Sequence, residues 1–336
     1  MAGKSGRTLS ITQESSWKKA VFSWEGILVL LFIAVNILCI CISPNYNLKN
    51  VLREMPKYLT EVFLLLPMAY LLILGEIDIS VGASVCLSAT MACMACNAGL
   101  PFPLVLLVGL AVGTLCGAVN GFILTRFTEL PPMIVTLGTQ IVFRGIAEIT
   151  LGSGGSISLT NTKQFHAMAG KIGPVPYMFF VVILAAAIYM VVLGKTTFGR
   201  RVYAIGSNSL ASYYAGIHVQ KIRFFVFTLA GFMAGVSAIF LTSVLYGANT
   251  TTGNGFEMDA IAMAVFGGIS TAGGKGKLLG AIISAFTIIC LRIGLGQINM
   301  NPQVILVILG ALLVLAVLLP NLAKKARSMG IMAKAA

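Results

Sequence analysis

Long apolar stretches alternate with short polar connections along the chain. Charged residues, proline or glycine bound each stretch, and most stretches have the roughly 20 residues that an α-helix needs to cross a bilayer. This pattern predicts an all-α, polytopic membrane protein with about ten transmembrane helices. The expected spans are residues 25–42, 58–75, 80–98, 103–125, 133–151, 177–193, 223–246, 258–272, 278–296 and 302–320.

The eighth span, residues 258–272, differs from the others. It is short, and glycines gather at its end and in the connection after it: Gly267, Gly268, Gly273, Gly274 and Gly276. Such interruptions occur at membrane depth where protein, not lipid, surrounds the backbone. We therefore expect a broken or packed-in helix here.

Composition narrows the class of protein. Of the 336 residues, 58% are hydrophobic and 10% are charged, against about 45–50% and about 25% in soluble domains. This balance excludes a soluble enzyme and a disordered protein, and the few charges exclude a nucleic-acid binder despite the net charge of +13. The seven cysteines lie in apolar stretches, and Cys93 and Cys96 have no second ligand pair, so no metal or other cofactor is expected.

The basic residues are unevenly divided between the two sides of the predicted bundle. Most lie in the tails and in the connections on the side of the termini, which by the positive-inside rule is the cytoplasmic side. Both termini are therefore predicted to be cytoplasmic, with tails at 1–24 and 321–336 flanking a membrane domain at 25–320. The few basic residues on the other side are Lys49, Arg53, Lys57, Lys163 and Lys171.

Three short motifs recur in the same order in the two halves of the chain. The pairs are Glu76-Ile-Asp78 with Glu257-Met-Asp259, Gly117–Phe122 with Gly280–Phe286, and Pro132–Gly138 with Pro302–Gly310. Five spans separate the members of each pair, so the copies would have opposite orientations in the membrane. The motifs indicate either an inverted repeat, with spans 2–5 repeated as spans 7–10, or chance similarity among helices rich in glycine and alanine.

A few polar residues inside or beside the spans are candidates for a substrate pathway or gate, because ionisable groups at membrane depth are costly and usually functional. Asp78 or Ser80 could equally cap the third span. Arg144 and Glu148, four residues apart, either line the pathway or form an interhelical pair. Arg292, near the outer end of the ninth span, is expected to extend to the interface. The candidates are Glu76, Asp78, Ser80, Asn120, Arg144, Glu148, Glu257 and Asp259.

The connection from 194 to 223 carries five basic residues and no acidic one. Within it, residues 209–217 read as a short helix that Gly216 terminates. This helix either lies on the bilayer or docks into a soluble partner. Nearby, Gly273-Gly-Lys275-Gly-Lys277 lacks the spacing of a nucleotide-binding P-loop, so the chain is not expected to bind ATP in that way.

Several motifs follow one another from the second span to the end of the chain: Gly75-Glu-Ile-Asp-Ile-Ser-Val-Gly82, Asn120-Gly121, Pro132–Gly138 with Phe143-Arg144-Gly145, Phe198–Asn208 with Ala215-Gly216-Ile217, and Gly255–Asp259 with Gly273-Gly-Lys-Gly276. Together they resemble permease subunits of bacterial ATP-binding-cassette importers of the ribose, xylose, rhamnose and autoinducer-2 group. The segments around Glu76 and Arg144 resemble the rhamnose-type branch most.

This resemblance implies a non-enzymatic subunit of the bacterial inner membrane that moves a monosaccharide or sugar-like solute by alternating access. The implied partners are a cytoplasmic ATPase subunit, an extracytoplasmic solute-binding protein, a second permease subunit and the lipid bilayer. The helix in the 194–223 loop would be the one that couples to the ATPase, although Ser209 and Leu210 stand where the family often has acidic residues. The coupling residues are Ser209, Leu210, Ala211, Ser212, Tyr213, Tyr214, Ala215, Gly216 and Ile217.

A rival hypothesis is an ion-coupled secondary transporter. In that case Glu76, Asp78, Arg144 and Glu148 would form a proton relay through the membrane. Such a protein would transport its solute without an ATPase.

Overall fold

The computed structural model describes residues 23–166, 168–301, 303–308, 310–311 and 314. Most of the predicted N-terminal tail, 1–24, all of the predicted C-terminal tail, 321–336, and most of the predicted tenth span, 302–320, lie outside these residues. The helices and strands are α2 (Trp24–Ile42), α3 (Leu48–Glu54), α4 (Pro56–Leu74), α5 (Val81–Asn97), α6 (Phe102–Arg126), α7 (Pro132–Leu151), the 3-10 helix η1 (Gly152–Gly154), β1 (Ser156–Ser158), α8 (Lys163–His166), β2 (Lys171–Ile172), β3 (Val175–Pro176), α9 (Tyr177–Lys195), α10 (Thr197–Ser207), α11 (Ser209–Tyr214), α12 (Val219–Leu245), β4 (Gly247–Asn249), α13 (Phe256–Phe266) and α14 (Leu278–Gln297).

The helices agree with the predicted spans. Seven of the described helices are long and apolar enough to cross a membrane, and α5 is a shorter apolar helix. The predicted eighth span is the 11-residue helix α13, which ends at Phe266 and is followed by Gly267. The all-α, polytopic class and the packed-in eighth helix are therefore confirmed. The four short strands in the described part of the chain form two small antiparallel pairs.

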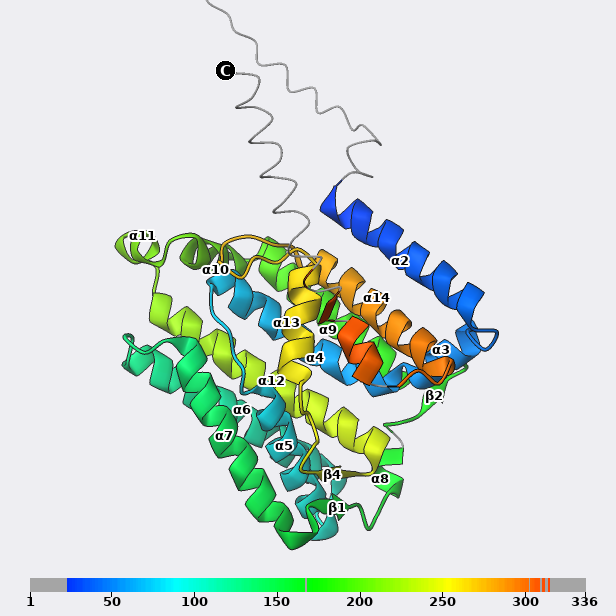
Figure 1. Cartoon of the computed structure of the whole chain (residues 1–336). Coiled ribbons are helices and arrows are strands. Elements are labelled where there is room, and N and C mark those ends of the chain that lie inside the picture. Colours follow the sequence, from blue (N-terminus) through cyan, green and yellow to red (C-terminus); the bar gives the residue numbers. More distant parts are fainter. Residues whose placement is uncertain (1–22, 167, 302, 309, 312–313, 315–336) are drawn as a thin grey trace, which may run out of the picture.

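Helices run between two ends of the bundle (Figure 1). Helix α11 lies at one end, here called the α11 side, and α3, β2 and α8 lie toward the opposite end, the α3 side. Helix α4 runs through the middle, and its side chains from Leu59 to Ile73 are almost completely buried. Large apolar side chains of the outer helices α2, α7 and α9 are exposed, which suits a surface solvated by lipid.

Helices α6 and α12 are packed closely along a row of glycines. Gly113 and Gly117 of α6, four residues apart, face Gly231 and Gly235 of α12. A Cβ atom on Gly113 would lie 2.5 Å from the carbonyl oxygen of Gly231, a separation that no side chain tolerates. The two backbones are therefore in direct contact, the arrangement by which small residues drive helix association in membranes.

Packing of the two halves partly follows the proposed inverted repeat. Helix α5 contacts α6 and α12, and its counterpart α13 contacts α14 and α4, as a two-fold relation between the halves requires. However, α6 packs far more extensively on α12 than α14 packs on α4. The order of the helix contacts therefore supports the repeat, whereas the unequal extent of packing in the two halves does not.

We expect Gly117→Ala to weaken the α6–α12 contact, because its methyl group would collide with the backbone of Phe227 and Gly231. Overpacking of this kind costs about 1–3 kcal/mol. Unfolding of the purified protein in mixed detergent micelles measures the loss. Gly194→Ala in α9 is the control, because its Cβ atom would have no neighbour within 4 Å; equal stability of the two variants would contradict the role of the glycine row.

Candidate functional site

An ion pair joins the α4–α5 connection to helix α12 on the α11 side. Gly75 ends α4 in the left-handed conformation, with φ of 81°, and turns the chain into the connection. The next residue, Glu76, pairs with Arg223 of α12, with Oε1 2.5 Å from Nε. Arg223 also donates from Nη1 to the carbonyl oxygen of Leu124 in α6, at 3.1 Å. Arg223 thus ties the connection to the close pair of helices α6 and α12.

Three other predicted residues form a buried network beside this ion pair. Asp78 Oδ1 accepts hydrogen bonds from the backbone N–H of Ser80 at 2.8 Å and from the Ser80 hydroxyl at 2.7 Å. Asn120 of α6 donates to the Ser80 hydroxyl oxygen at 2.7 Å. Ser80 is the N-cap residue of α5, and no side chain caps this helix, so the prediction that Asp78 or Ser80 caps it is wrong. Asp78 instead binds the N–H and the hydroxyl of Ser80 itself.

A charged triad lies near the α3 side of the bundle. The guanidinium of Arg292, in α14, donates from Nη1 to both carboxylate oxygens of Glu61 at 3.0 and 2.8 Å, and from Nη2 to Asp259 of α13. The prediction that Arg292 extends to the interface is wrong, because Arg292 is only 7% exposed. The carboxylates of α4 and α13 hold it inside the bundle.

Glu61 was not among the predicted residues. The sequence contained a signal for it, since it is the only acidic residue within the apolar run from 58 to 75. An acid in that position needs a partner inside the protein. The sequence could not identify that partner, which lies 231 residues further along the chain.

Arg144 and Glu148 do not pair, and the prediction of an interhelical or same-face ion pair is wrong for the described residues. Arg144 instead donates from Nη1 to the carbonyl oxygens of Thr250 and Thr252, at 2.7 and 3.4 Å. The turn after β4 supplies these acceptors closer to Arg144 than the exposed carboxylate of Glu148. Arg144 therefore fastens this turn to α7.

Glu257, another predicted residue, lies buried where α13 meets α5 and α7. Gln140 of α7 donates to its Oε1 atom at 3.4 Å. Its Oε2 atom is buried without a hydrogen-bond partner and lies so close to Gly82 that only glycine fits there. Glu257 thus has one carboxylate oxygen inside the bundle that no described residue binds.

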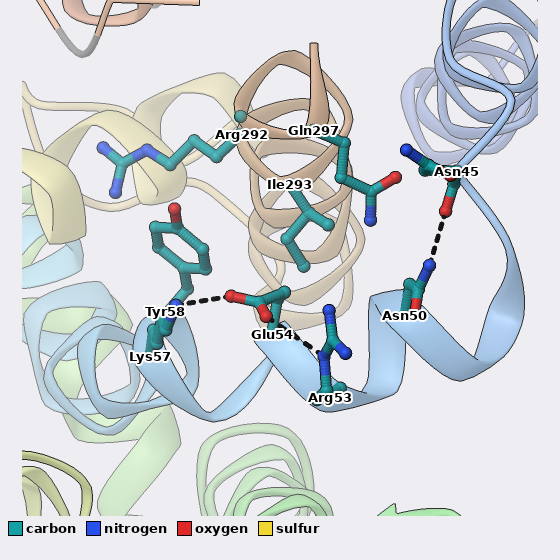
Figure 2. A pocket seen from close by; sticks show the side chains of 10 residues that line it. Asn45, Asn50, Arg53, Glu54, Lys57, Tyr58, Arg292, Ile293 and Gln297 are labelled. Atoms are coloured by element: carbon teal, nitrogen blue, oxygen red, sulfur yellow. Dashed lines mark hydrogen bonds and ion pairs between the residues drawn. The ribbon is translucent and has the colours of Figure 1, made fainter. Parts of the chain in front are cut away.

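A polar cavity of about 560 Å³ opens on the α3 side. Figure 2 shows the residues that line it, among which Glu54 forms ion pairs with Arg53 and Lys57. The Lys57 ammonium, which donates to the Glu54 carboxylate, holds the pKa of Glu54 below its ordinary value. Both polar atoms of the Gln297 amide are buried without a partner. The remaining lining residues are Asn45, Asn50, Tyr58, Arg292, Ile293 and Gly296.

The short helix predicted within residues 209–217 is present as α11, and it projects at the end of the bundle (Figure 1). Asn208 caps its start by accepting from the backbone N–H of Ala211 at 2.9 Å, and Gly216 follows its end with φ of 81°. Leu210, Tyr213 and Tyr214 are exposed on it. An apolar and aromatic surface is thus presented on a short, well-capped helix.

Backbone contacts connect α10, the helix before α11, to the interior of the bundle. Gly206 of α10 lies against the carbonyl group of Ile73 in the last turn of α4, where any side chain would collide. The backbone N–H of Gly274 donates to the same Ile73 oxygen at 2.8 Å. Tyr203 of α10 donates from its hydroxyl to the carbonyl oxygen of Gly276 at 2.7 Å. We call this meeting of α10, the end of α4 and residues 270–277 the glycine junction.

The predicted residues therefore lie in separate groups. Glu76 and the network of Asp78, Ser80 and Asn120 lie on the α11 side, whereas Arg144, Glu257 and Asp259 lie toward the α3 side. No hydrogen bond or ion pair between described residues joins Glu76 or Asp78 to Arg144 or Glu148. The four residues of the hypothetical proton relay do not form a continuous chain.

The apolar helical spans, with ion pairs buried between them, are those of a multi-pass membrane protein. Residues 58–317 match the family described as branched-chain amino acid transport system, permease component. The chain belongs to this family of permeases.

Curated relatives cover nearly the whole chain. A ribose import permease of Bacillus subtilis (strain 168) is 34% identical over 296 residues, which are 87% of this chain and 90% of the relative. A D-allose transport system permease of Escherichia coli (strain K12) is 33% identical over 336 residues, 95% and 100% of the two chains. An autoinducer-2 import system permease of Photorhabdus temperata is 29% identical over 304 residues, 88% and 90% of the two chains.

A solved structure of a metal-chelate-type ABC transporter in an inward-facing conformation has a similar fold. The TM-score is 0.51 at 13% sequence identity, over 90% of this chain and 99% of that chain. The fold of an ABC transporter membrane subunit is therefore present in this chain.

We expect Arg292→Met to destabilise the protein strongly, because it leaves the Glu61 and Asp259 carboxylates without their partner. Breaking a buried pair costs about 3–5 kcal/mol. Arg53→Met is the control, since its ion pair is exposed and worth at most about 1 kcal/mol. Unfolding in mixed micelles compares the two, and adding Glu61→Gln to Arg292→Met should restore part of the loss. Similar losses for Arg53→Met and Arg292→Met would contradict a structural triad.

Proposed function

We propose that this chain is the membrane subunit of an ATP-binding-cassette importer that carries a monosaccharide or sugar-like solute by alternating access. Membership of the permease family and relatives named for ribose, D-allose and autoinducer-2 import support this proposal. The motifs around Glu76 and Arg144, which resemble the rhamnose-type branch, add rhamnose to the candidate solutes. ATP hydrolysis takes place on a separate partner chain, and this chain is not itself an enzyme.

The α11 side faces the cytoplasm in this proposal, and both termini lie there. Basic residues gather on this side, including Arg200, Arg201 and Lys221, as the positive-inside rule requires. The α3 side then faces outward and receives the solute from an extracytoplasmic solute-binding protein. The membrane is the bacterial inner membrane.

The glycine junction is the observation that carries the coupling proposal. Helix α11, with the proposed coupling residues 209–217, docks into the ATPase subunit, and α10 connects it directly to the end of α4 through Gly206 and Ile73. No flexible side chain lies between these backbones to absorb a displacement. A movement of α11 therefore reaches Gly75 and the Glu76–Arg223 ion pair, which hold the α4–α5 connection.

A second permease subunit completes the pathway. On helix α7, Gly138 and Glu148 are exposed and Gly145 is half-buried. A Cβ atom on either glycine would have no neighbour within 4 Å. Small residues exposed on a membrane helix favour close approach of another helix. This surface supports association of α7 with a second permease chain, a copy or a paralogue.

The rival hypothesis of an ion-coupled transporter lacks a structural basis among the described residues, because Glu76, Asp78, Arg144 and Glu148 are divided between the two ends. Purification from native membranes in mild detergent, followed by reconstitution in liposomes, separates the two functions. We expect a Walker-motif ATPase to co-purify and uptake to require ATP. Gradient-driven uptake by this chain alone would overturn the proposal.

Replacing the exposed aromatic residues of α11 tests the docking. We expect Tyr213→Ser combined with Tyr214→Ser to abolish co-purification of the ATPase, because exposed aromatic side chains commonly supply most of an interface's binding energy. Tyr177→Ser, which changes a partly exposed tyrosine at the start of α9, is the control. Normal capture of the ATPase by the α11 variant would place docking elsewhere.

Replacing Gly206 tests transmission separately from docking. We expect Gly206→Val to leave ATPase binding intact and to lower ATP-driven uptake about tenfold or more, the scale of a coupling free energy of 1–3 kcal/mol. Gly194→Val in α9 is the control, since a Cβ atom there meets nothing within 4 Å. Uptake and ATP hydrolysis are measured together in proteoliposomes, and unchanged uptake by the folded Gly206 variant would exclude the glycine junction as the route.

A further inference from the structure

A groove of about 320 Å³ lies between the end of α6 and the start of α12, on the α11 side. Close contact at Gly121 and Phe224 brings the two helices together, with a hypothetical Cβ of Gly121 3.1 Å from the Phe224 carbonyl oxygen. Beyond this contact, the rings of Phe122 and Phe225 are 61% and 60% exposed. The groove is therefore apolar and open toward the surroundings of the bundle.

Two basic side chains lie at the rim of this groove. Arg126 belongs to the last turn of α6 and Lys221 to the first turn of α12. Both are exposed, and neither has a carboxylate partner among the residues that the structure describes. Arg223, another basic residue of α12, differs from these two, because it already binds Glu76 and the carbonyl oxygen of Leu124. Arg126 lies over the Phe127 ring, 5.9 Å from its centroid, but no carboxylate neutralises it, so both cations can bind an anion from outside the chain.

An apolar groove with two cations at one end matches one class of ligand in a membrane, an anionic glycerophospholipid. Its acyl chains would lie against the phenylalanine rings, and its phosphate would meet the two basic side chains. A zwitterionic lipid fits less well, because its own ammonium group offsets the attraction. The neutral solute of the proposed function has no charge to match, and the proposed ATPase contact lies on α11.

We propose that the groove between α6 and α12 binds one anionic glycerophospholipid through Arg126 and Lys221. The binding itself requires only that the chain lies in a membrane, and the orientation proposed above assigns the lipid to the cytoplasmic leaflet. The bound lipid holds together the ends of α6 and α12 next to the residues that bind Arg223. It thereby stabilises the helix ends that support the Glu76 ion pair.

Fluorescence quenching by brominated lipids tests the site in nanodiscs of the full chain. Phe225→Trp adds a reporter in the groove, and the unsubstituted chain supplies the background from its two native tryptophans. We expect brominated phosphatidylglycerol to quench the added signal at much lower mole fraction than brominated phosphatidylcholine. Removing both charges, with Arg126→Gln and Lys221→Gln, should reduce this preference about tenfold or more, since each surface cation contributes roughly a fivefold preference.

The control variant removes two exposed cations on the α3 side, with Lys163→Gln and Lys171→Gln, and should keep the preference. Native mass spectrometry of the chain without the reporter gives a second readout, in which one phosphatidylglycerol should remain bound after delipidation and be lost in the Arg126/Lys221 variant. Equal quenching by the two lipids, or equal retention in both charge variants, would overturn the proposal. Neither result bears on ATP-dependent uptake, so failure here is distinguishable from failure of the proposed function.

Discussion

Direct backbone contact between α6 and α12 is the constraint on which the arrangement of the bundle depends. A membrane provides no hydrophobic force between helices, so close packing of glycines must supply much of the association. Gly113 and Gly117 face Gly231 and Gly235, and no side chain separates the two helices. Because α6 and α12 meet so closely, Arg223 of one reaches the Leu124 carbonyl oxygen of the other and still pairs with Glu76.

Ion pairs at both ends join the two halves of the chain. On the α11 side, Glu76 from the first half binds Arg223 from the second. On the α3 side, Glu61 from the first half shares Arg292 with Asp259, both from the second. These contacts hold the first and second halves of the chain together at each end of the bundle. The glycine junction connects the helix that we propose to dock into the ATPase with the segment that carries the Glu76–Arg223 ion pair.

Much of the fold could be predicted from the sequence, because the hydrophobic pattern is local. Helix positions, the short α13, the helix at 209–217 and its glycine terminator all follow from neighbouring residues. Asp78 likewise binds Ser80, two residues away. The predictions failed where partners lie far apart in the chain. Arg144 binds carbonyl groups more than 100 residues away, and no side-chain pattern marks a backbone acceptor.

The sequence by itself determined that the chain crosses a membrane, which segments form helices and which residues there are costly to bury. Hydropathy and charge decide these properties segment by segment, without reference to the rest of the chain. Only the tertiary structure decided how the buried charges are neutralised, that Glu61 holds Arg292 inside and that Glu148 remains exposed. Those outcomes depend on which helices touch, and glycine contacts between distant segments determine that.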